Sequence, residues 1–238
     1  MNSSAIKRLL VAGILGLALI GPTGGARATL IISAAVGSAP TGANYVNFDS
    51  LPLGNSGGVS SGLGVSFTSG DGATVAGALA NKYAAPYLSN SNGALFGDSN
   101  NGPDTTDYLS TGIGSITLTF STGQKYLGLL WGSVDDYNSL SFYDGATLVG
   151  SVTGTDVWPS ANGNQGVNGT FYANINSDVA FDSVVASSTN YAFEFDNVAY
   201  DSHDPGKVPE PSTLALLCAG LLGFAALGRM NRSSHLSL

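Results

Sequence analysis

Two short polar segments carry the oxygen ligands that a hard cation needs. Asn47 and Asp49 occur in the segment NYVNFDS, and Asp196 and Asn197 occur in FEFDNVAY. Carboxylate, amide and backbone carbonyl oxygens are the ligands that Ca²⁺ takes in proteins. Both segments have the pattern of strand ends that a β-sandwich brings together, so they predict one structural calcium site on these four residues. The alternative is that these side chains only hydrogen-bond the backbone of turns and edges.

A second group of residues has the chemistry for binding sugars. Tyr137 follows Asp135 and Asp136 in a predicted loop, and Trp158 lies in another loop rich in Asn and Asp. Aromatic faces stack on sugar rings, and carboxylates and amides hydrogen-bond sugar hydroxyls. We predict ligand contacts at Tyr137 and Trp158, with the two aspartates as a second cation candidate. The alternative for Trp158 is a ring packed on the domain edge, whereas Trp131 is predicted to be core.

Residues suited to catalysis are sparse. His203 is the only histidine between residues 29 and 206, so a Ser-His-Asp triad would have to form beside the linker at the end of this span. Glu194 is the only glutamate of the span, and its place in the alternating segment FEFDN predicts a position on the sheet surface. We predict no catalytic residue and a non-enzymatic protein. The alternative is a polysaccharide hydrolase or lyase in which aspartates supply paired carboxylates.

Composition excludes several other classes. The 238 residues include 8 Lys and Arg against 16 Asp and Glu, a net charge of −8. This balance lacks the basic stripe of a nucleic-acid-binding protein. Cys218 is the only cysteine, which excludes a disulfide scaffold and a zinc site of paired cysteines. Residues 29–206 carry fifteen acidic and two basic side chains, so the middle of the chain has a net charge of −13.

The first 28 residues have the pattern of a secretory signal peptide. Lys7-Arg8 precedes an apolar run from Leu9 to Ile20, which is too short to span a bilayer comfortably. Ala26-Arg27-Ala28 offers the small residues that signal peptidase requires. We expect export through the Sec machinery, cleavage after Ala28 and an exported domain over residues 29–206. The alternative is an uncleaved N-terminal membrane anchor.

Residues 207–238 contain three parts in a fixed order. Val208-Pro209-Glu210-Pro211 comes first, the uncharged segment from Ser212 to Gly228 follows, and Arg229 and Arg232 come last. Seventeen residues are the lower limit for a transmembrane helix. Because basic flanks stay cytoplasmic, such a helix would lie in the inner membrane with the preceding domain outside.

This tail resembles the PEP-CTERM sorting signal, which occurs in Gram-negative bacteria that make exopolysaccharide. The resemblance implies processing by exosortase and a route from a membrane-anchored intermediate to the cell surface or extracellular matrix. Tails of this type also bear the description "ice-binding protein C-terminal domain". Only Thr117-Leu118-Thr119 fits the repeated Thr-x-Thr of an ice-binding face, so we expect no such activity. We expect association with exopolysaccharide, with calcium as a bridge where the polymer is also acidic.

The exported domain alternates apolar and polar residues with the period of two that marks β-strands. Ile116, Leu118 and Phe120 alternate with Ser and Thr, and Asp144-Gly145 marks a hairpin turn. Short strands separated by Gly, Asn and Ser favour an all-β fold. We predict a β-sandwich of jelly-roll type with about ten strands.

Most of the predicted strands follow from the same alternation, whereas residues 125–131 form a continuous buried-type run. The segments LGLLWGSVDDYNSLSFYDG and FEFDNVAY also resemble a recurrent type of PEP-CTERM exported domain, which implies a surface β domain of unassigned chemistry. Strands are predicted at residues 45–48, 63–68, 113–120, 125–131, 140–152 as a hairpin, 167–175, 179–186 and 191–200, with long loops at 90–111 and 155–169.

Overall fold

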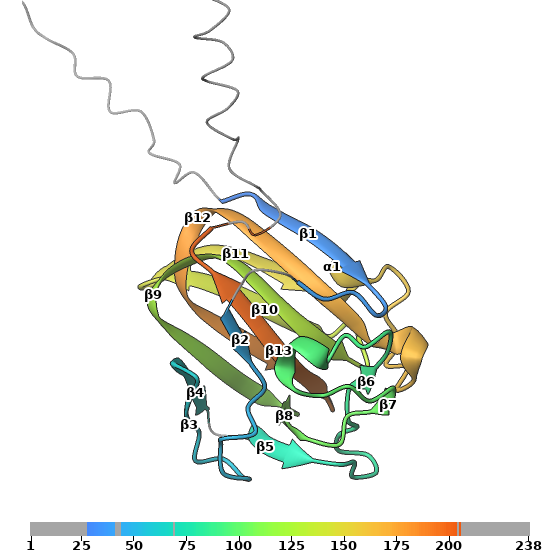
Figure 1. The fold of residues 1–238 in the computed structure, drawn as a ribbon. Coiled ribbons are helices and arrows are strands. Elements are labelled where there is room, and N and C mark those ends of the chain that lie inside the picture. The colour runs from blue at the N-terminus through green and yellow to red at the C-terminus, as the bar shows by residue number, and fades with distance from the viewer. Residues whose placement is uncertain (1–27, 41–43, 69, 204, 206–238) are drawn as a thin grey trace, which may run out of the picture.

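Two long antiparallel strands run through the whole domain. They are β9 (Gly114–Gly132) and β12 (Phe171–Ser188), which pair along most of their length (Figure 1). The computed structural model describes residues 28–40, 44–68, 70–203 and 205. The register of the pair shifts on both sides of Phe181. Each long strand therefore has two halves, and each half joins a different layer.

The first layer forms around the second half of β12. This half pairs with β10 on one side and with the first half of β9 on the other, and β9 then pairs with β4. β11 pairs with β10, and β3 pairs with β4, so these two strands form the edges. The bounds are β3 (Gly58–Ser60), β4 (Leu63–Phe67), β10 (Asn138–Asp144) and β11 (Thr147–Thr153).

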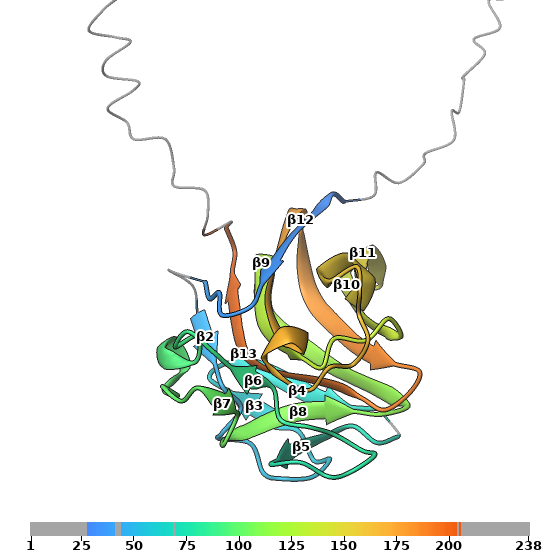
Figure 2. The ribbon, with the colours of Figure 1, turned by 90° about the vertical axis from the view of Figure 1, so that its right-hand side faces the viewer.

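The second layer forms around the other halves of the same two strands. The first half of β12 pairs with β1, and the second half of β9 pairs with β13. β2 and β8 pair with different parts of β13, and β5 pairs with β8. Figure 2 shows β1 and β13 on one side of the molecule and β10 and β11 on the other. The bounds are β1 (Leu30–Ala35), β2 (Asn44–Val46), β5 (Ala73–Ala76), β8 (Asp107–Thr111) and β13 (Phe193–Asp201).

One hydrophobic core fills the space between the layers. Ile116 and Leu118 enter it from the first half of β9, and Leu127, Leu129 and Trp131 enter it from the second half. The inward residues are even-numbered in the first half and odd-numbered in the second, so the strict alternation is interrupted between Thr119 and Tyr126, where the pairing with β12 shifts register. The predicted all-β sandwich is confirmed, although the strands predicted at 113–120 and 125–131 are one continuous strand.

The hairpin predicted at Asp144-Gly145 is confirmed between β10 and β11. Gly145 has a φ of +55°, in the left-handed region that glycine adopts without strain. The strand predicted from Val167 begins only at Phe171. Strand β1 was not predicted. The two predicted long loops contain short elements that the period of two does not reveal. These elements are β7 (Gly102–Pro103), which pairs with β6 (Tyr87–Leu88), the 3₁₀ turns η1 (Ala94–Phe96) and η2 (Val167–Gly169), the strand β8, and α1 (Gly154–Val157).

The predicted signal peptide, sorting motif and C-terminal helix lie outside the described residues. Within the part of the chain that the structure describes, no helix has the length and hydropathy needed to cross a membrane.

A substitution at Phe181 tests how strongly the stability of the core depends on the residue at which the register shifts. Its buried ring contacts Phe120 and Phe142, with centroid distances of 5.7 and 5.0 Å. We expect Phe181→Ala to lower the free energy of unfolding by about 3 to 5 kcal/mol, because it removes apolar contacts and leaves a cavity. Urea unfolding measures the loss, with Val179→Ala at an exposed position of the same strand as the control. Equal losses of unfolding free energy in Phe181→Ala and Val179→Ala would contradict the importance of Phe181 for the core.

Candidate functional site

A long connection covers the outer face of the second layer. This covering segment comprises residues 84–107, which include β6, η1 and β7, and it lies across β13 in Figure 1. It is held by a second apolar cluster outside the main core. Strand β13 is therefore buried on both faces. The cluster consists of Leu88 and Phe96 from the covering segment and Tyr126, Leu130, Tyr172 and Ala199 from the layer beneath.

Glu194 projects from β13 toward the covering segment. Phe193 and Phe195 enter the core, so the residue between them must point to the other face. That face is covered, and Glu194 is only 2% exposed. The prediction that Glu194 lies on the sheet surface was wrong, because alternation identifies the opposite face but not what covers it.

Protein donors hold both oxygens of the Glu194 carboxyl. The Ala84 backbone N–H donates to one oxygen at 2.9 Å, and the Ser133 hydroxyl donates to the other at 2.6 Å. Burial raises the pKa of Glu194 to about 7, the two hydrogen bonds oppose this rise, and the charge of Asp135 adds to it. The carboxyl therefore exchanges a proton near neutral pH.

Glu194 lines a polar cleft of about 390 Å³. Asp135, which is 8% exposed, provides a second carboxyl, and its pKa is raised chiefly by burial. The walls carry three tyrosines and four amide side chains, all of which can contact a polyhydroxylated ligand. The predicted loop at 155–169 supplies two of the amides. The tyrosines are Tyr83, Tyr137 and Tyr191, and the amides are Asn81, Asn162, Gln165 and Asn190.

A network of ring and charge contacts fixes one wall of the cleft. The Tyr137 hydroxyl donates to the backbone carbonyl of Tyr191 at 2.6 Å. The Lys82 ammonium lies 4.3 Å from the centre of the Tyr191 ring, and it pairs with Asp71 at 3.5 Å. A smaller hollow of about 210 Å³ shares Lys82, Tyr83 and Tyr191 with the cleft. These three side chains form the wall between the two spaces.

The structure separates the two predicted sugar-binding aromatics. Tyr137 lines the cleft together with Asp135. Trp158 instead packs its ring against Phe171, with a centroid distance of 5.4 Å, at the edge of the main core. Trp131 is fully buried and stacks on Phe193 at 4.4 Å, which confirms its predicted place in the core.

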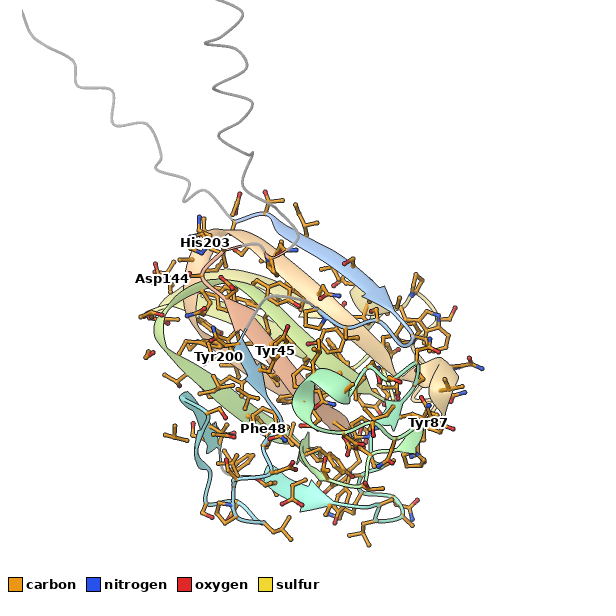
Figure 3. All side chains as sticks on the ribbon, in the orientation of Figure 1. Tyr45, Phe48, Tyr87, Asp144, Tyr200 and His203 are labelled. Carbon is orange, nitrogen blue, oxygen red and sulfur yellow. The ribbon has the colours of Figure 1, made fainter. Side chains whose placement is uncertain are left out.

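His203 lies far from a built site. Its side chain is 88% exposed, and its contacts are the neighbouring Ser202 hydroxyl at 3.0 Å and the Asp201 carboxylate at 3.5 Å. Figure 3 shows His203 near the end of the molecule where the described chain ends. These partners are sequence neighbours on an exposed segment, which does not provide the enclosed surroundings of a nucleophilic triad.

The structure does bring the two predicted calcium segments together. Val46 pairs with Val198, which places Asn47 of one segment beside Asn197 of the other. Asn47 donates its amide hydrogen to Asp49 at 2.7 Å and to the carbonyl of Phe96 at 2.9 Å. Asn197 is buried in a left-handed conformation at the register shift between β13 and β9.

Asp196 lies on the same covered face of β13 as Glu194 and is fully buried. Sequence reasoning did not assign Asp98 and Asp104 to this site, although both are buried on the covering segment near it. Their signal was a loop too long and too rich in Asp and Asn for a simple connection. Among the residues described, no three Asp, Glu, His or Cys side chains group as a metal site by themselves.

Glu194 should give the protein a measurable pH dependence. Its pKa rises from 4.5 in the unfolded chain to about 7 in the fold, so the folded state binds this proton more tightly. The resulting stability, about 3 kcal/mol, is present below pH 4.5 and is lost as the pH rises to 7. We expect the free energy of unfolding of Glu194→Gln, measured with urea, to fall less between pH 4.5 and 7 than that of the unmodified protein. Asp144→Asn is the control and should keep the pH dependence of the unmodified protein. The same pH dependence in Glu194→Gln would contradict the raised pKa of Glu194.

Comparison with solved structures finds distant likenesses of the described domain. The K2 cleaved adhesin domain of Lys-gingipain (Kgp) is 10% identical with a TM-score of 0.38, over 66% of this chain and 96% of that chain. A mutant of the family 29 carbohydrate-binding module CBM29-2 is 10% identical with a TM-score of 0.34, over 71% and 99%. The enzymatically active domain of bacteriophage CBA120 tailspike protein 4 is 15% identical with a TM-score of 0.30, over 61% and 21%. Likenesses at these scores carry no functional argument.

The family comparison concerns the C-terminal tail. No curated protein matches the sequence. Residues 207–229 match the family model described as the PEP-CTERM protein-sorting motif, and this span includes the predicted Val208-Pro209-Glu210-Pro211 segment. Such a tail implies export through the secretion pathway, a membrane-anchored intermediate and processing by exosortase. The chain therefore carries a PEP-CTERM protein-sorting motif at its C-terminal end.

Proposed function

We propose that this protein is a non-enzymatic saccharide-binding protein of the cell surface or extracellular matrix. Its ligand is a neutral part of the surface exopolysaccharide, and the cleft around Glu194 is the binding site. The observation that carries the proposal is the composition of that cleft. Tyrosine rings, amides and carboxyls, the groups that contact sugar rings and hydroxyls, line one hollow of about 390 Å³.

The charge of the cleft favours a neutral ligand. Asp135 and Glu194 are its carboxyls, and Lys82 is its one cationic group among the described lining residues. Lys82 is already paired with Asp71 and covers the Tyr191 ring. An anionic sugar would meet two acidic groups without a free counter-charge, so hydroxyl groups suit the site better than carboxylates.

A polysaccharide hydrolase or lyase is the second candidate. A carboxyl that exchanges a proton near neutral pH, with another carboxyl in the same cleft, has the character of a general acid or base. The carboxyl of interest is then Glu194 and not an aspartate alone. Binding is favoured because protein donors already hold both Glu194 oxygens, which leaves this group anchored in the wall.

The amides Asn162 and Gln165 test the binding proposal, since both side chains are exposed at the cleft. We expect Asn162→Ala combined with Gln165→Ala to weaken retention on the native exopolysaccharide by about tenfold, because two hydrogen bonds of about 0.5 to 1.5 kcal/mol are lost. Affinity electrophoresis through gels containing the polymer measures the change. Asn55→Ala removes an exposed amide elsewhere and should leave retention unchanged.

The same samples separate the two candidates. A binding protein releases no new reducing ends and does not lower the viscosity of the polymer. Polymer scission by the unmodified protein that disappears in Glu194→Gln would replace the binding proposal with the enzyme. Equal retention of the double variant and the unmodified protein would exclude this cleft as the binding site.

The sorting route is tested by replacing Pro209-Glu210-Pro211 with alanines. We expect the unmodified protein to yield a mature species that begins at Thr29 and lacks Leu214 to Leu227, because exosortase acts on the tail. The variant should keep its tail and stay in the membrane fraction. Intact mass of the protein recovered from membrane and medium of the host measures both. An uncut, membrane-retained unmodified protein would mean that the tail is only an anchor.

A further inference from the structure

Asp196 is a fully buried carboxyl whose nearest polar neighbours are the Asp104 carboxyl and the backbone N–H of Asn197. Both of its oxygens are enclosed. It lies two residues after Glu194 on the same covered face of β13. Well-placed donors hold both oxygens of Glu194, whereas Asp196 has the Asn197 backbone N–H nearby but no donor in hydrogen-bond geometry. Burying a charge without compensation is costly, so this carboxyl needs a counterpart that protein groups do not provide.

The covering segment presents two more carboxyls with free oxygens. Asp104, 3% exposed, uses one oxygen to accept hydrogen bonds from the backbone N–H and hydroxyl of Thr106, at 2.8 and 2.7 Å. Asp98, 8% exposed, uses one oxygen to accept from the backbone N–H of Asn100 at 2.8 Å. The second oxygen of each is buried without a partner. Their turns therefore hold one oxygen and leave the other available.

The carboxyls of Asp196 and Asp104 face each other, close enough to share a proton. As two carboxylates they would offer acceptors only, and neither would satisfy the other. Burial and then the charge of Asp104 raise the pKa of Asp196 well above its usual value, and Asp49 adds to the negative potential. The ion pairs of the described residues, Lys82 with Asp71 and His203 with Asp201, lie elsewhere.

We propose that Asp196 and Asp104 together bind one calcium ion between β13 and the covering segment. A shared proton would engage one oxygen of each carboxyl and leave the second Asp196 oxygen without a partner, whereas a divalent cation can bind several oxygens at once. The oxygens fit calcium, which takes carboxylate, carbonyl, amide and water ligands in flexible geometry. Zinc prefers nitrogen and sulfur ligands, and magnesium demands near-ideal octahedral geometry.

The proposal relocates the calcium site that the sequence suggested. Asp196 remains a ligand, but Asp49 already accepts hydrogen bonds from Asn47 and from the Asp107 backbone, at 2.7 and 3.1 Å. Asp104 replaces Asp49 as the second carboxylate. Because no three acidic side chains form the site alone among the described residues, carbonyl, amide or water oxygens complete the coordination.

Calcium binding on the full-length chain, purified in detergent and stripped with a chelator, tests the proposal. Equilibrium dialysis with calcium alone should give one bound ion per chain. Calcium at about one hundred times its Kd should raise the Tm by about 5 to 10 °C, because the ion binds only the folded state. Neither measurement uses a saccharide, so its result is independent of the proposed sugar-binding function.

Conservative variants assign the site. Asp104→Asn and Asp196→Asn keep the side-chain size but remove one charge each, and both should lose the bound calcium and the Tm shift. Asp144→Asn is the control, since this exposed residue lies at the end of the molecule away from Tyr87 of β6 (Figure 3). If Asp196→Asn does not fold, the bound calcium and the Tm shift of Asp104→Asn alone test the proposal. No calcium bound by the unmodified chain, or an unchanged shift in Asp104→Asn, would overturn the proposal.

Discussion

The continuous pairing of β9 with β12 is the constraint on which the rest of the structure depends. Each strand contributes to both layers, so the register shift beside Phe181 fixes how the layers face each other. The core can close only if inward residues of both halves meet. In β9 the inward positions change from Ile116 and Leu118 to Leu127, Leu129 and Trp131 across the stretch where the register shifts. Strand β13 then pairs with the second half of β9, and every candidate functional carboxyl is positioned relative to β13.

Two carboxyls are buried on the outer face of β13, and their surroundings differ. Glu194 and Asp196 both lie under the covering segment, where burial disfavours the charged form of a carboxyl. Donors from Ala84 and Ser133 stabilise Glu194, and its proton exchanges near neutral pH. Asp196 meets another carboxyl in Asp104 and lacks such donors. This contrast is why one group is interpreted as part of a polar cleft and the other as a cation ligand.

The two sites share the covering segment, which connects their roles. Its first residue, Ala84, holds Glu194 at the edge of the cleft, and Asp104 near its other end faces Asp196. A cation at Asp104 would fasten this segment to β13, while the apolar cluster around Phe96 and Tyr172 holds its middle. The proposed saccharide site would then be rigid without a disulfide, which suits an exported domain with no cysteine between residues 29 and 206.

The sequence by itself determined the features that depend on local order. The sorting motif is linear, and the turn at Asp144-Gly145 needs only the preference of glycine for a positive φ. The period of two predicted most of the longer strands, and a continuous apolar run predicted the burial of Trp131. It also indicated that Glu194 and Phe193 face opposite ways. The tertiary structure alone decided that the face of Glu194 is covered, by a residue 110 positions away, and that Asp104 meets Asp196. Alternation reports the side to which a residue points, but burial depends on which distant segment packs there, and no local pattern encodes that contact.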